Sequence, residues 1–109
     1  MSAAKGTIHA GVCGFVTEVT ATSPDQQHVQ LSVISTCETI QRLAERLPEF
    51  DAFDELRYGF DGELHRVVRE YLNGCCSGCA VPAGLFKAMQ VAAGLALPAP
   101  TSIHLEKRQ

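Results

Sequence analysis

The most restrictive feature of the sequence is the apolar run VPAGLFKAMQVAAGLALP at residues 81–98, in which only Lys87 and Gln90 are strongly polar. Pro82 suits the first position of a helix, because its missing N–H group is not needed there. Pro98 cannot continue a helix. We therefore predict a helix over residues 82–96. A helix that is apolar on nearly every side must be covered on most of its surface, so the rest of the chain has to fold around it.

Two stretches of β-branched and aliphatic residues, 7–21 and 28–36, flank the turn-forming sequence SPDQQ at 23–27. This pattern predicts a β-hairpin. A pairing in which opposite positions sum to 50 puts the apolar odd-numbered residues on one face, whereas a sum of 49 sets Glu18 against Leu31. We prefer the first register. It places Cys13 directly across from Cys37.

The remaining elements follow from helix signals and from a final alternating stretch. Ser35 and Glu38 have the spacing of a capping box, and an apolar stripe follows up to Pro48. We interpret residues 49–61 as a loop with one helical turn, and 62–72 as a second helix that ends at Asn73 and Gly74. TSIHLEK at 101–107 predicts a C-terminal strand. The expected order is β-β-α-α-α-β, a single α+β domain over residues 1–109.

Size and charge exclude several classes of partner. A chain of 109 residues can bury a core without disulfides. Its formal net charge is −3 and it has no Lys/Arg cluster, which argues against binding to nucleic acid or to an anionic membrane. The N-terminal residues lack the apolar run of an export signal, so we expect a cytoplasmic protein.

The five cysteines are the residues that carry chemistry. Disulfides are rare in a reducing compartment, which leaves free thiols, a metal site or redox chemistry. Cys76 and Cys79 have a CxxC spacing that can chelate one ion, and four thiolates are the usual ligands of structural zinc or of an iron–sulfur cluster. We predict such a metal centre from Cys13, Cys37, Cys76 and Cys79, with Cys75 as a substitute for Cys76.

A second hypothesis makes Cys79 a reactive thiol. It precedes a helix N-terminus, which favours the thiolate. CAVPAGLFKA resembles the Cys-Pro-x-Pro helix start of small sulfur carriers of the sulfurtransferase A type, in which that cysteine carries a persulfide. Cys79 and Pro82 match the motif, whereas Ala80 replaces its first proline. Under this hypothesis Cys76 would act as the resolving thiol, and a protein partner would exchange sulfur.

A third hypothesis is a structural or interaction domain with buried free cysteines, dimeric through a face bearing Val12, Val16 and Ile34. Whether the chain is an enzyme stays open.

A broader resemblance covers most of the chain. The series GVCGF, SVISTCETIQRLAERL and CAVPAGLFKAMQVAAGLALP resembles a small prokaryotic family of unknown function. The resemblance implies that Cys13, Cys37 and Cys79 are the cysteines typical of the family and that Cys75 and Cys76 are additions in this member. It implies no activity.

Overall fold

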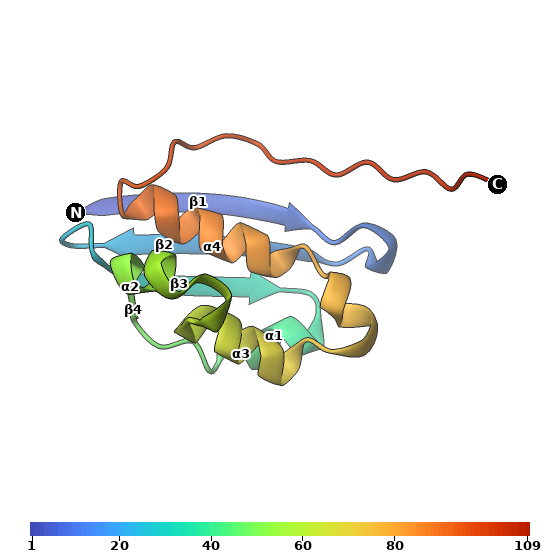
Figure 1. Ribbon diagram of the computed structural model, residues 1–109, viewed down its shortest axis with the longest axis horizontal. Helices are drawn as coiled ribbons and strands as arrows, with labels where there is room; N and C mark the ends of the chain where they lie inside the picture. Colours follow the sequence, from blue (N-terminus) through green and yellow to red (C-terminus); the bar gives the residue numbers. More distant parts are fainter.

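A four-stranded antiparallel sheet carries the helices on one of its faces (Figure 1). The computed structural model describes residues 1–109. The predicted α+β class is confirmed, but the predicted order of elements is not. The strands are β1 (Ser2–His9), β2 (Val16–Ser23), β3 (His28–Ser35) and β4 (Phe50–Asp51), in that order across the sheet. The helices are α1 (Glu38–Ala44), α2 (Ala52–Tyr58), α3 (Glu63–Tyr71) and α4 (Val81–Ala92).

The first predicted strand, 7–21, is in fact parts of two strands. β1 ends at His9, a short 3₁₀ helix η1 (Gly11–Cys13) reverses the chain, and β2 pairs back along β1. Gly11 and Gly14 have φ values of 78° and 73°, which residues with a Cβ adopt only under strain. The two glycines thus allow the reversal within an otherwise strand-like sequence.

The predicted register between β2 and β3 was wrong by two residues. Paired positions sum to 52, so that Val19 lies opposite Val33 and Ala21 opposite Leu31. A shift of two keeps every side chain on its own face, and the odd-numbered residues of both strands do face the helices. Cys13 lies outside the strands, in η1, so the predicted cross-strand pairing of Cys13 with Cys37 was also wrong.

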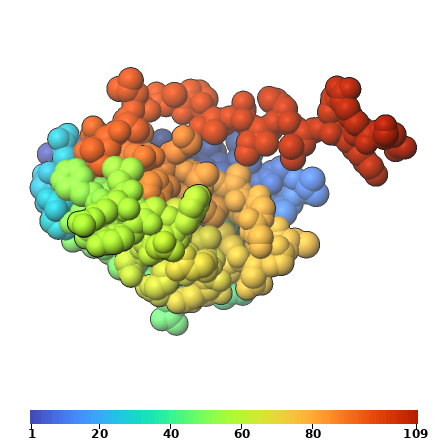
Figure 2. Space-filling view, in the orientation of Figure 1, coloured from blue at the N-terminus to red at the C-terminus, as the bar shows by residue number.

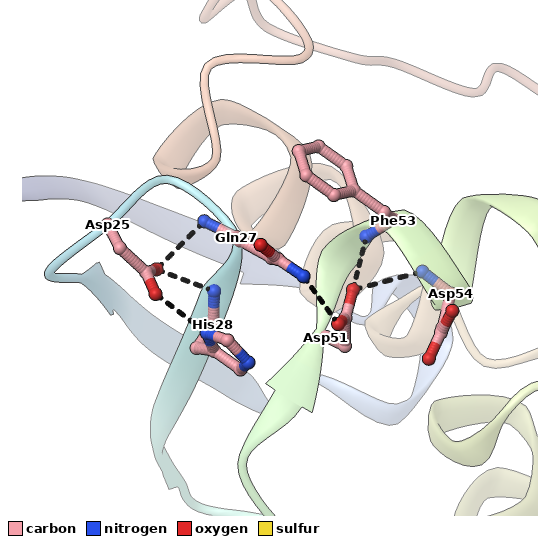
Figure 3. Close-up of polar contacts among 6 residues, drawn as sticks. All are labelled: Asp25, Gln27, His28, Asp51, Phe53 and Asp54. Atoms are coloured by element: carbon pink, nitrogen blue, oxygen red, sulfur yellow. Dashed lines mark hydrogen bonds and ion pairs between the residues drawn. The ribbon is translucent and has the colours of Figure 1, made fainter.

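Residues 49–61 contain more structure than the predicted loop with one turn. Phe50 and Asp51 form β4, and α2 follows for seven residues. Asp51 begins this helix, because its Oδ1 accepts hydrogen bonds from the N–H groups of Phe53 (3.0 Å) and Asp54 (3.2 Å) (Figure 3). An aspartate in this position satisfies N–H groups that have no partner within the helix.

The turn between β2 and β3 is joined to this cap. The Oδ1 of Asp25 accepts from the N–H groups of Gln27 (2.9 Å) and His28 (2.8 Å), and its Oδ2 lies 2.7 Å from Nδ1 of His28 (Figure 3). The side chain of Gln27 then donates to Oδ2 of Asp51 at 2.8 Å. The turn and the start of α2 are therefore held as one unit.

We expect the Asp25–His28 pair to be visible in a pH titration. Its hydrogen bond raises the pKa of His28 above the ordinary 6.5 and holds the pKa of Asp25 well below 3.8. Protonated His28 therefore stabilises the fold; this contribution is present below pH 6.5 and is lost as the pH rises through the raised pKa. Because both groups are exposed, the change in stability should be small.

NMR titration of the His28 ring checks this expectation. Asp25→Asn keeps the oxygen that accepts from the turn but removes the charge, so the pKa of His28 should fall toward 6.5 in that variant. An unchanged pKa would show that Asp25 does not control this histidine.

The core lies between the sheet and α4, as the apolar run predicted. Leu85, Met89 and Ala92 of α4 are buried against Val19 and Ala21 of β2. The helix ends at Ala92, earlier than the predicted Ala96, and Gly94 follows with a φ of 75°. The predictions of α1 and α3 were correct in outline, with bounds that differ by a few residues.

The predicted C-terminal strand is absent. Residues 95–109 have no helix or strand, and 101–109 are all exposed. Ile103 is 72% exposed and Leu105 is 91% exposed. The alternation of apolar and polar residues is present, but no strand of the same chain pairs with it.

Candidate functional site

Three chain segments that carry cysteines meet at one end of the molecule. They are the connection from β1 to β2, the chain between β3 and α1, and the chain between α3 and α4 (Figure 1). They contain all five cysteines, and all five are free thiols. The fold thus gathers at one end residues that are up to 66 positions apart in the sequence (79 − 13).

Cys76 and Cys79 occupy one tight turn at the end of the short 3₁₀ helix η3 (Gly74–Gly78). The N–H of Cys79 donates to the carbonyl of Cys76 at 3.1 Å, and the N–H of Cys76 donates to the carbonyl of Asn73 at 3.1 Å. The Sγ of Cys79 accepts a hydrogen bond from the N–H of Val81, the first residue of α4, at 3.5 Å. The turn therefore fixes the CxxC pair directly before the buried helix.

Cys37 is the N-cap residue of α1, the position that the capping-box spacing had assigned to Ser35. Its N–H donates to the hydroxyl of Ser35 at 3.1 Å, and that hydroxyl lies 2.8 Å from the hydroxyl of Thr17 in β2. Thr17 is buried. These two hydroxyls tie the backbone of Cys37 to the sheet. The predicted capping box of Ser35 and Glu38 is not formed, because Ser35 ends β3 and no side chain caps α1. The sequence pattern also gave no sign of the contribution of Thr17.

Burial separates the five thiols into two groups. Cys37, Cys76 and Cys79 are partly buried and pack against the hydrophobic core, whereas Cys13 and Cys75 are exposed. This difference favours Cys76 over Cys75 as the second member of the CxxC pair, since a residue packed on the core has a more fixed position.

The pKa of Cys79 is opposite to our expectation. Burial in the protein raises it above the ordinary 9.0, and this effect outweighs the hydrogen bond from the N–H of Val81. Cys76, Cys37 and Cys13 are near enough for repulsion between thiolates to raise it further. Cys79 is therefore a thiol at neutral pH, and the helix N-terminus does not make it a thiolate.

The thiols are gathered but are not arranged as a finished metal site. As the side chains stand, no three His, Cys, Asp or Glu residues form a group able to hold a metal ion. His9, the histidine nearest in sequence to Cys13, lies on β1 with an exposed side chain. The carboxylates of Asp51 and Glu55 are used to cap α2 and α3.

The comparison with protein families decides which family the chain belongs to. A model for a family of unknown function, DUF6951, matches residues 4–105. The chain belongs to this family. The resemblance to a family of unknown function is thereby confirmed, and the match includes all five cysteines. No curated protein and no solved structure matches the chain, and the local likeness to sulfur carriers gains no support.

Membership of DUF6951 therefore brings no activity to this chain, and its chemistry has to be argued from the cysteines themselves. None of its helices has the length and apolar character needed to span a bilayer.

Proposed function

We propose that the protein binds a soft metal, zinc or an iron–sulfur cluster, through Cys13, Cys37, Cys76 and Cys79. The observation that carries this proposal is the convergence of these cysteines from three separate segments, close enough for their charges to act on Cys79.

The electrostatics of the cluster favour a metal over a resting thiolate. Several thiols in partly buried surroundings cannot all ionise, because each negative charge opposes the next. A divalent cation removes this repulsion and stabilises every thiolate that it binds. The raised pKa of Cys79 therefore disfavours a free nucleophile at neutral pH but is compatible with a metal ligand, whose proton is released on binding.

The parts of the proposed centre differ in rigidity. Cys37 is tied to the sheet by Ser35 and Thr17, and the CxxC turn is held by hydrogen bonds between backbone groups. Cys13 lies in η1 between two glycines and is exposed. We infer that binding draws Cys13 toward the other three, since its side chain is exposed and does not pack against the core.

Anaerobic purification followed by elemental analysis and an ultraviolet-visible spectrum tests the proposal. We expect one zinc ion per chain, or iron and sulfide in equal amounts with the absorption of thiolate-bound iron. A chain purified without metal that also takes up neither zinc nor iron on reconstitution would contradict it.

A second candidate function, thiol redox chemistry, is favoured by the geometry of the CxxC turn alone. The 3.1 Å hydrogen bond from Cys79 to Cys76 keeps the two residues in one turn. They could form a disulfide by exchange with a small disulfide such as oxidised glutathione, which takes up the two electrons and two protons that the thiols lose.

Mass spectrometry after such an exchange distinguishes the candidates. Under the redox hypothesis a disulfide forms between Cys76 and Cys79, and the metal-free chain loses the mass of two hydrogen atoms. In a separate labelling experiment, Cys79 should react with iodoacetamide faster than the other thiols. Uniformly slow labelling without bound metal would leave a structural or interaction domain.

A further inference from the structure

Part of β3 has an unpaired edge. β4 pairs with β3 only at His28 and Val29. At the two ends of β3, the carbonyls of Gln27 and Ser35 accept hydrogen bonds on the side away from β2. Their donors are the N–H of Ala52 (2.8 Å) and the side chain of Gln41 (2.8 Å). Because backbone groups alternate in direction along a strand, the N–H and C=O groups of Leu31 and Val33 point to this same edge. No strand pairs with them there.

A groove runs beside this edge. Its floor is residues 31–35 of β3, and its other wall is α1, through Gln41, Ala44 and Glu45. The groove has a volume of about 530 Å³. Leu31, Val33 and Ala44 are only partly buried. An edge strand next to a helix, with apolar side chains between them, is the arrangement that binds extended peptides by adding a strand to the sheet.

The C-terminal segment of this chain has the features of such a peptide. Residues 96–109 contain no helix or strand, and their backbone makes no hydrogen bond to the backbone of the rest of the chain. Ile103 and Leu105 alternate with polar residues and are exposed. The end of the segment projects beyond the rest of the molecule (Figure 2). The family match extends to residue 105, so it includes both apolar residues.

We propose that residues 101–107 of a second copy add as a strand to the edge of β3, in the groove beside α1. Within one chain the segment runs along the β1 side of the sheet, whereas α1 lies on the opposite side (Figure 1). The segment of another copy is therefore the occupant. Reciprocal exchange between two copies gives a closed dimer.

Charge and length support this occupant. Glu38, Gln41 and Glu45 follow one stripe of α1 at i, i+3 and i+7, and Glu45 lines the groove. Within the segment, Glu106 pairs with Arg108, which leaves Lys107 as the unpaired charge for Glu45. The other free edge, β1, carries Lys5, which repels Lys107. Seven residues extend about 23 Å, enough to follow the whole of the open edge.

Analytical ultracentrifugation of the full chain under reducing, anaerobic conditions tests the proposal. Reductant excludes dimers linked through the exposed Cys13 and Cys75. We expect a concentration-dependent dimer that is at least tenfold weaker in the double variant Ile103→Asp, Leu105→Asp. The matched control Ser102→Asp, His104→Asp adds the same negative charge on the other face of the strand and should dimerise within threefold of the wild type. All four residues are exposed, so neither variant should affect folding.

Amide hydrogen exchange locates the contact. Exchange at Leu31 and Val33 should slow as the chain is concentrated, and should stay fast in the Ile103, Leu105 variant. A chain that remains monomeric, a dimer that the double variant does not weaken, or protection that appears along β1 instead would each overturn the proposal.

Discussion

Glu55→Ala should lower the free energy of unfolding by about 3 kcal/mol, because it leaves two N–H groups at the start of α3 without partners. Glu55 is only 3% exposed although it carries a carboxyl group. Its Oε1 accepts from the N–H of Leu64 at 2.7 Å, and its Oε2 accepts from the N–H of Glu63 at 3.0 Å. A side chain of α2 thus replaces the usual local cap of α3. Chemical denaturation monitored by circular dichroism measures the loss.

The control is Glu70→Ala, which removes an exposed carboxylate that pairs with Arg66 on the surface of α3. Exposed ion pairs contribute at most about 1 kcal/mol, so this variant should be close to the wild type. Glu55→Gln keeps one acceptor oxygen and should fall between the two. Equal stabilities of Glu55→Ala and Glu70→Ala would show that Glu55 does not hold α3.

Gly84→Ala should destabilise the protein by about 1 kcal/mol, because overpacking costs roughly 1–3 kcal/mol and the higher helix propensity of alanine offsets about 1 kcal/mol of that cost. A methyl group at this position of α4 would overlap Cδ1 and Cγ1 of Ile8 in β1. α4 packs closely on β1 here only because residue 84 has no side chain. The shift of the unfolding midpoint in denaturant, at unchanged m-value, gives the cost.

Ile8→Ala provides the double-mutant test. It removes both atoms that the methyl group would meet, so Gly84→Ala should cost much less in that background than in the wild type. Gly78→Ala is the control, since nothing lies within 4 Å of a methyl group there. A full cost for Gly84→Ala in the Ile8→Ala chain would place the strain elsewhere.

The pattern of apolar residues predicted which face of each strand is buried, because a period of two does not depend on register. Val19 and Ala21 face the core under both the predicted and the observed pairings. The same pattern could not show that 7–21 spans two strands. Only Gly11 and Gly14 signalled the reversal, and a glycine in a strand-like stretch is also compatible with a bulge.

The helices that depend on polar contacts, α2 and the start of α3, were harder to predict than the apolar α4. α4 was predicted because its whole sequence is apolar. α2 was missed because its mixed composition has no clear apolar stripe, although Asp51 lies two residues before Phe53 as a helix cap requires. The role of Glu55 as a helix cap could not be recognised from the sequence, since its partners lie eight and nine positions away.

The gathering of the cysteines was predicted for a reason that proved wrong. Cys13 and Cys37 do not pair across a hairpin; they come together because η1 and the start of α1 lie at the same end of the sheet. The approach of α4 to that end depends on tertiary packing and could not be read from the sequence. The raised pKa of Cys79 also depends on tertiary packing, because it follows mainly from burial, and it could not be predicted from the sequence for that reason.

The most direct test of the cysteine centre is the metal content of three chains purified anaerobically in parallel. We expect the wild type and Cys75→Ser to carry the same stoichiometric zinc or iron, since Cys75 is exposed and does not pack on the core. Cys76→Ser should lose most of it, because it removes half of the CxxC pair. Equal metal in Cys76→Ser and the wild type, or no metal in any of the three, would contradict a centre built on Cys13, Cys37, Cys76 and Cys79.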